Sequence, residues 1–272
     1  MPTSDPITIS SPTTTPSIPP QSPQVQQPST IATTTKGQCF ETTQELRTSV
    51  VAYMNNDPNV HTRYGSTLNE WCVDTIQDFS SLLYNGTYTT LFESFNDDIS
   101  LWNTSSATNM PYMFYAAHSF QHNLSMWDVS SVLDMLYMFY DAIVFNNDIS
   151  TWDVSSVTNM DSMFSNAIQF NIDLSQWKVS SVTDMSNMFN AAVKFNSNLS
   201  LWDVSSVIEM DSMFRHTDQL NQDISLWDIS SVTNMNNMFY MSSKFNQNLC
   251  PWIDHIRPGT QVYNMFTLSG CT

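Results

Sequence analysis

Basic residues are scarce in this sequence: 8 Lys and Arg stand against 25 Asp and Glu, and the formal net charge is −17. A surface that binds nucleic acid needs clustered basic side chains, so this deficit argues against such a partner. Long hydrophobic runs are also missing, because no segment approaches the roughly 18 apolar residues of a membrane-spanning helix. We therefore expect no nucleic-acid partner and no membrane insertion by this chain.

Catalytic signatures are missing as well. The sequence contains no P-loop, GxSxG, HExxH or CxxC motif, and its five His recur at no regular spacing. These absences predict that the protein is not an enzyme and holds no metal through a dedicated motif. The first ten residues show no secretion signal, from which we expect a mature or fragment form, or a chain without an export signal of its own.

Glycine and proline are few and unevenly placed. All 5 Gly lie outside residues 95–250, and most of the 12 Pro fall within the first 28 residues. Residues 1–38 consist almost wholly of Ser, Thr, Pro and Gln and include no aromatic residue. Such a segment cannot bury enough surface to offset its ordering entropy. We interpret 1–38 as a disordered linker, either an O-glycosylated stalk or a plain solvated tail.

The rest of the chain is dominated by a repeat of 25 residues. Trp recurs at that spacing, and so do two sets of Met, which we call columns because their members share one position in every repeat. Each Met of the second column is followed by Phe. The clearest copy is FNNDISTWDVSSVTNMDSMFSNAIQ, residues 145–169. The predicted domains are an N-terminal cap at 39–94, regular repeats at 95–249 and a C-terminal cap at 250–272. The Trp column comprises Trp102, Trp127, Trp152, Trp177, Trp202, Trp227 and Trp252.

The spacing of apolar residues within one repeat predicts its local structure. Ile149, Trp152, Val154 and Val157 follow one another at intervals of two or three, which is too tight for one helical face and typical of short extended segments. The segment 161–167 has a composition compatible with a helical turn. Before the repeats, residues 42–56 read as a capping helix, because Thr42 and Glu45 form a capping-box pattern.

The motif FNxD[IL]SxWDVSSVTxMxxMFxxA resembles the 25-residue repeat of the BspA-like leucine-rich-repeat surface proteins, which include the DUF285 group. The resemblance covers about residues 40–272. It implies a leucine-rich-repeat-like solenoid on a cell surface, with adhesion or partner binding as its role and no catalytic residues. With the pattern above, the expected fold is a repeat solenoid of short parallel β-strands with one short helical turn per 25-residue coil and an N-terminal capping helix.

Several columns have a structural interpretation. The Met columns are predicted to fill the core beside the aromatic rings, rather than to bind metal. An Asn column is predicted to act as a ladder of buried amides between coils. Two acidic columns are interpreted either as a solvated or edge-capping face or as a weak calcium site. Their members are Asp98, Asp148, Asp173 and Asp223, and Asp128, Asp153, Asp203 and Asp228.

The four cysteines all lie in the two caps. Because a stack of coils separates its ends, the reachable pairs are Cys39–Cys72 and Cys250–Cys271, with free buried thiols as the alternative. Disulfides indicate an oxidising compartment, and we expect an extracellular or cell-surface location. N-glycosylation sequons at Asn85, Asn103, Asn123 and Asn198 give this location weak support.

The repeat departs from its own pattern most visibly at four tyrosines, Tyr112, Tyr115, Tyr137 and Tyr140. Elsewhere these two phases hold mainly Ser or Asn. Residues of the same phase are neighbours in a stack, so the tyrosines are predicted to form one aromatic patch that binds a protein or a glycan. The alternative is that they pack against the inserted segment around 85–90.

Three functions follow from these observations. The first is a non-enzymatic cell-surface or secreted protein that acts in adhesion, or in protein or glycan binding, through one face of the repeats. The second is a structural spacer or cell-wall component with no specific ligand. The third, ice binding, is disfavoured because Leu133 and Ile208 interrupt the only threonine column. The expected partner is a protein or glycan at a cell surface, and no cofactor is expected.

Overall fold

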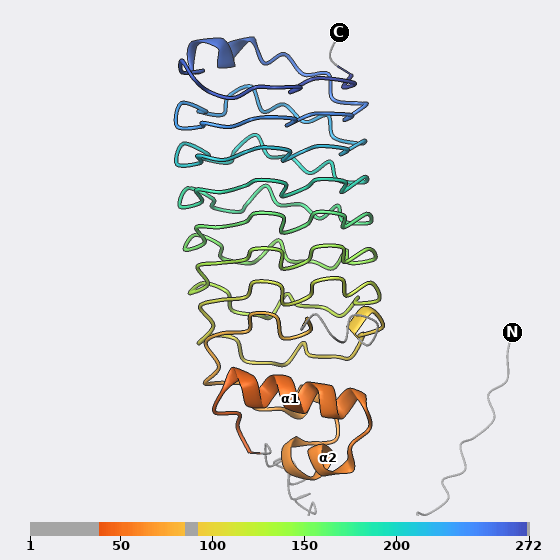
Figure 1. Cartoon of the computed structure of the whole chain (residues 1–272). Helices are drawn as coiled ribbons and strands as arrows, with labels where there is room; N and C mark the ends of the chain where they lie inside the picture. Colours follow the sequence, from red (N-terminus) through yellow and green to blue (C-terminus); the bar gives the residue numbers. More distant parts are fainter. Residues whose placement is uncertain (1–37, 85–91, 271–272) are drawn as a thin grey trace, which may run out of the picture. The chain divides into compact units, whose positions relative to one another are not determined.

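A computed structural model describes residues 38–84 and 92–270, which belong to one compact unit, Lys36–Thr272. The predicted linker at 1–38 lies outside the described residues except for Gln38. Within the described unit, successive repeats wind into coils that stack on one another, and α1 and α2 lie at the N-terminal end of the stack (Figure 1).

The N-terminal cap consists of helices. The helix expected over 42–56 is present as α1, Thr43–Met54, and it begins where the Thr42 side chain accepts a hydrogen bond from the Glu45 N–H. Glu45 returns a bond to the chain before the helix, at the N–H of Glu41. Two shorter elements follow, α2 at Pro58–Tyr64 and the 3-10 helix η1 at Leu68–Glu70.

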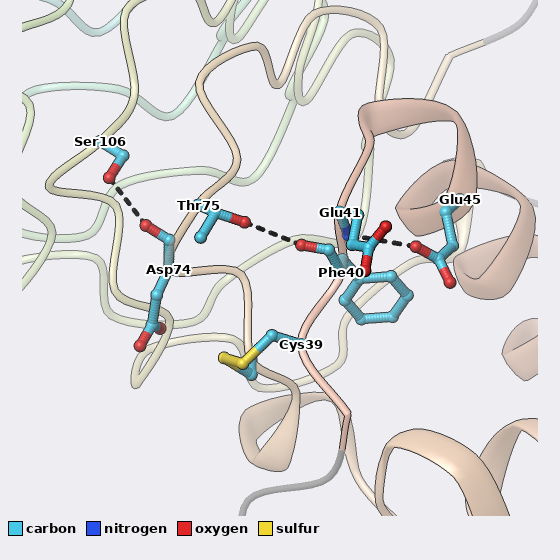
Figure 2. Close-up of a disulfide and its surroundings, with 8 residues drawn as sticks. Cys39, Phe40, Glu41, Glu45, Asp74, Thr75 and Ser106 are labelled. Atoms are coloured by element: carbon cyan, nitrogen blue, oxygen red, sulfur yellow. Dashed lines mark hydrogen bonds between the residues drawn. A yellow bond between two sulfur atoms is a disulfide. The ribbon is translucent and has the colours of Figure 1, made fainter.

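A disulfide fastens this cap to the first coil. Cys39 and Cys72 are bonded, as the sequence predicts, and 33 residues separate them along the chain. Figure 2 shows the surrounding bonds: the Thr75 hydroxyl donates to the Phe40 carbonyl at 2.9 Å, and the Ser106 hydroxyl donates to the Asp74 carbonyl at 2.7 Å. These contacts bring the segment before α1 against the chain that follows η1.

The expectation of a strand-based solenoid is wrong. Residues 38–84 and 92–270 contain no β-strand, and the regular repeats contain no helical turn. The β-bridges between successive coils are isolated parallel ones, and further backbone hydrogen bonds join the coils, such as the one from the Ser162 N–H to the Ser186 carbonyl at 2.8 Å. One bridging residue per coil forms this series, from Asp78 through Asn109 and onward to Gln261. The 3-10 helix η2, Cys250–Asp254, follows the last regular repeat.

Side chains explain why strands do not form. In the segments expected to be strands, side chains occupy backbone N–H groups that a strand could offer to its neighbour: the N–H of Ser150 donates to Asp148 Oδ1, and the N–H of Ser155 donates to Asp153 Oδ1. The segment expected to be helical is interrupted by left-handed residues at Ser162, φ 56°, and Asn166, φ 60°. The chain therefore runs through linked turns, and period-two alternation of apolar residues marks turns rather than strands.

The apolar columns make the core, as the periodicity predicts. Trp102 through Trp252 are all buried, with no more than 4% of any side chain exposed, and both Met columns are buried throughout the regular repeats. Each indole N–H donates to a carbonyl of the preceding coil, as Trp177 does to Ile149 at 3.1 Å. A column of phenylalanine rings also stacks, with Phe164 and Phe189 centroids 5.8 Å apart.

The asparagine column links the coils but is not buried. Asn171 Oδ1 accepts from the N–H of Asn196, and Asn196 Oδ1 accepts from the N–H of Asn221, both at 2.8 Å. The expected ladder is therefore present, whereas its expected burial is wrong, because these side chains lie on the surface. An exposed amide can still fix the register of the next coil because its bond is to the backbone.

Candidate functional site

The acidic columns act as turn caps. In the first column Asp173 Oδ1 accepts from the N–H of Ser175 at 2.9 Å, and in the second Asp228 Oδ1 accepts from the N–H of Ser230 at 3.0 Å. These bonds hold the pKa of both carboxyls below its ordinary value. Bonding to a neighbouring N–H is the usual behaviour of Asp and Asn at turns. The columns thus have a structural explanation that needs no ligand.

No cluster of three or more His, Cys, Asp or Glu that could hold a metal occurs among the residues that the structure describes. Weak calcium binding by the acidic columns stays a prediction. In the same part of the chain, no helix has the length and apolar character needed to cross a membrane.

The four predicted tyrosines come together in one cluster. Tyr112 stacks on Tyr137 with ring centroids 5.0 Å apart, and Tyr115 stacks on Tyr140 at 4.8 Å. Tyr84, which the sequence analysis did not single out, joins the cluster 4.5 Å from Tyr115. Burial raises the pKa of the Tyr112 and Tyr115 phenols, and their tyrosine neighbours raise it further, so both stay neutral at neutral pH. We call these five residues the tyrosine cluster.

The cluster includes two residues in a costly backbone conformation. Tyr112 and Tyr137 lie in the left-handed region with φ of 58° and 55°. The same phase is left-handed in later repeats too, where Ser162 and Asn187 hold it. Asn adopts this conformation with little penalty, whereas a bulky residue there is an outlier whose cost is of order 1 kcal/mol or more. The backbone conformation alone would therefore favour Asn over Tyr at positions 112 and 137.

The tyrosine cluster borders a hollow of about 360 Å³. Tyr137 and Tyr140 line it on one side, and Arg215 and His216 line it three repeats further along the chain. The sequence analysis missed these two basic residues, although Arg215 occupies the same phase as Tyr140 and departs from the Ser or Asn found between them. Between the two ends lie Ser162, Ser165, Asn166, Asn187, Asn190 and Ala191.

Tyr137 and Tyr140 are half-buried rather than freely exposed, so their rings help to enclose this hollow. The alternative, packing of the cluster against segment 85–90, concerns residues outside those described. Two other hollows lie at the ends of the described unit, about 520 Å³ beside α1 and α2 and about 500 Å³ around Trp252 and Phe266. In the first of these, Glu45 already accepts bonds from Arg63 and Tyr64.

The remaining predicted site residues lie apart from the hollow. Cys250 is an exposed free cysteine among the described residues, and its expected partner Cys271 falls outside them, so that pairing stays a prediction. Asn103, Asn123 and Asn198 are exposed, while the fourth sequon, Asn85, lies outside the described residues. Glycosylation of these sites stays a prediction as well.

One protein family matches the chain, and it does so twice. The family described as "Mycoplasma protein of unknown function, DUF285" matches residues 88–198 and 169–270. Together these ranges include all the regular repeats, the tyrosine cluster apart from Tyr84, and the hollow. No curated protein and no solved structure matches the chain.

Proposed function

The chain belongs to the DUF285 family, and we propose that it is a non-enzymatic surface or secreted protein that binds a glycan or protein partner through its tyrosine cluster. One observation carries this proposal. Tyr112 and Tyr137 occupy left-handed positions that other repeats fill with Ser or Asn, and they stack beside a hollow. Strained residues of this kind concentrate at ligand sites, where binding compensates for their cost.

The chemistry of the cluster suits binding rather than catalysis. Tyrosine combines a broad apolar ring with a neutral hydroxyl that donates and accepts hydrogen bonds, which is why it is common at recognition surfaces. The wall of the hollow adds amides from Asn187 and Asn190. These groups can position a ligand, and our proposal includes no reaction.

The finer family assignment and the location are also proposals. The repeat motif supports a relationship with the BspA-like surface proteins, which suggests adhesion as the biological context. The Cys39–Cys72 disulfide supports an extracellular or cell-surface location, because such bonds persist in oxidising compartments. No cofactor is part of the proposal.

The test is an array of glycans and cell-surface proteins probed with the chain and with the double variant Tyr137→Ser/Tyr140→Asn. Both new residues already occur at these phases, at Ser162 and Asn190. We expect the variant to fold with a change in stability of about 0.5 kcal/mol or less, because other coils already hold these residues in the same backbone conformation. Binding should fall at least tenfold, about 1.4 kcal/mol, since aromatic anchors dominate recognition surfaces.

The matched control is Leu226→Gln. Leu226 is 85% exposed, belongs to a different column from the tyrosines, is not among the residues that line the hollow, and has Gln176 as its precedent in its own column. This variant should bind like the unaltered chain. Equal binding by the tyrosine variant would remove the cluster from the site, and an absence of any ligand would favour the structural-spacer alternative.

A further inference from the structure

The tyrosine columns stop at an open ring face. Tyr112 stacks on Tyr137 with an interplanar angle of 4°, and Tyr115 stacks on Tyr140 with an angle of 7°. In the next repeat the same phases hold Ser162 and Ser165, which are buried and too small to continue the stack. The hollow begins at this step. A ligand with a flat apolar face can therefore stack on Tyr137 and Tyr140 as the next member of each column.

The middle of the hollow offers an unmet hydrogen-bond acceptor. The Asn190 amide donates through Nδ2 to Asn187 Oδ1 at 3.3 Å. Asn190 Oδ1 is buried and has no hydrogen-bond partner among the described residues. A buried polar atom without a partner is uncommon in folded proteins and indicates a missing donor. A ligand hydroxyl in the hollow would supply it once the Asn190 amide turns toward the ligand.

The far end of the hollow is basic, although the chain carries a net charge of −17. Arg215 and His216 both line it, and the Arg215 guanidinium lies 5.5 Å from the Tyr240 ring centroid. None of the ion pairs formed by the described residues includes Arg215. A guanidinium held over a ring with its donors available matches the two oxygens of a carboxylate.

The nearby acids limit how much negative charge can enter. Asp161 and Asp211 come directly before Ser162 and Ser212 in the sequence. Neither aspartate is among the residues that line the hollow. Burial raises the pKa of both carboxyls, and nearby carboxylates raise it further. A single carboxylate at Arg215 fits this arrangement better than a densely charged polyanion, which neighbouring acids would repel.

The length of the hollow sets the size of the ligand. Tyr140 and Arg215 are three repeats apart in one phase, and stacked tyrosines advance by 4.8 Å per repeat. A pyranose ring stacked on the tyrosines takes up about one such step along the column. It also presents a flat apolar face and a rim of hydroxyl groups, which are the two features that the tyrosines and Asn190 call for.

We propose that this hollow binds a di- or trisaccharide segment bearing one carboxylate, with a sugar ring stacked on Tyr137 and Tyr140 and the carboxylate paired with Arg215. This inference rests on the proposed function and names its ligand class. The hydroxyl groups donate to Asn190, and the stacked sugar fills the step above Ser162 and Ser165.

The test is calorimetric titration of the full chain with trisaccharides of two neutral sugars and one terminal galacturonic, glucuronic or mannuronic acid unit, each paired with its neutral methyl ester. At least one acid should bind tenfold or more tightly than its ester. Arg215→Asn, which has Asn190 as its precedent, should abolish this preference. Lys194→Gln removes the same charge at an exposed site that contacts Gln169, and it should change affinity less than twofold.

The outcomes separate this inference from the proposed function. Equal binding of acid and ester, or a preference that survives Arg215→Asn, would overturn the carboxylate contact. If no trisaccharide binds, the proposed ligand class is wrong. Binding of aromatic peptides on the array would then indicate a protein ligand instead. In each of these cases the proposed function stands if array binding still depends on Tyr137 and Tyr140, and it fails if that dependence is absent.

Discussion

Individual side chains in this protein are explained by the phase they occupy. Most phases hold one residue type whose contact recurs in every coil, such as the tryptophan that donates to the preceding coil. Where a residue differs from the others in its column, the contact that the others make does not explain why that residue is there. Tyr137 and Arg215 are departures of this kind, and both line the same hollow.

Asp211 provides a residue-scale test of this reasoning. Its carboxyl is half-buried, and burial together with Glu209 and Asp184 raises its pKa. The same phase holds Asn236 one repeat later. Asp211→Asn should therefore stabilise the protein at neutral pH, by about 0.5 kcal/mol or less because solvent screens a half-buried charge.

The pH dependence of this effect has a definite sign. A carboxyl whose folded-state pKa is raised is destabilising when ionised, and this penalty disappears as pH falls through the folded pKa toward the unfolded value of about 3.9. The advantage of Asp211→Asn should therefore shrink between neutral pH and pH of about 4. Urea unfolding at a series of pH values measures it, and an advantage that grows toward acid would contradict the assignment.

At the scale of one coil, the element is a chain of capped turns rather than a strand. The sequence analysis identified the acidic columns and left edge capping as one of their explanations, and it identified the apolar alternation correctly. It could not foresee that Asp148 and Asp153 would occupy the N–H groups that a strand requires. Left-handed residues were equally hidden, because Ser162 and Asn166 hold positions where glycine is the usual signal.

A matched pair of variants tests this description of the coil. Asp148→Ala removes the acceptor for the Ser150 N–H, whereas Asp148→Asn keeps it, as Asn123 and Asn198 do in the same column. The alanine variant should lose about 0.5–1 kcal/mol of unfolding free energy, the usual value of one such bond, and the asparagine variant should lose much less.

Acid should erase part of this difference. Bonds from Ser150 hold the pKa of the Asp148 carboxyl below its ordinary value. A lowered folded-state pKa contributes stability above the unfolded pKa of about 3.9, and that contribution is lost as pH falls through the folded pKa. Unfolding curves for the asparagine variant should therefore be less sensitive to acid than those of the unaltered chain. Equal losses for alanine and asparagine would exclude the turn-cap role.

At the scale of the whole described unit, each coil is stabilised by its contacts with the coils on either side. The sequence predicted the repeats, the N-terminal helix and the Cys39–Cys72 bond, because each leaves a local or periodic pattern. The hollow left no periodic pattern, since it forms along one phase where Tyr140, Asn190 and Arg215 differ from one another. Arg215 could have been found from the sequence, because it departs from the Ser and Asn that precede it in its column.

The N-terminal cap should control fraying of the stack. Cys39→Ser with Cys72→Ser opens a loop of 33 residues and should cost about 3 kcal/mol, because the bond restricts the unfolded chain. Since repeats depend on their neighbours, amide exchange should accelerate most in α1 and the first coil. Uniform acceleration of amide exchange along the chain would argue against local fastening.

The central claim is that ligand binding resides at the open face of the tyrosine columns. Nuclear magnetic resonance of tyrosine-labelled protein, titrated with the strongest ligand from the array, tests it without altering any residue. The ring signals of Tyr137 and Tyr140 should shift with the binding isotherm, while those of Tyr64 in the cap and Tyr263 near the C-terminal end should stay in place. Shifts confined to Tyr64 or Tyr263, with Tyr137 and Tyr140 unmoved, would contradict the account.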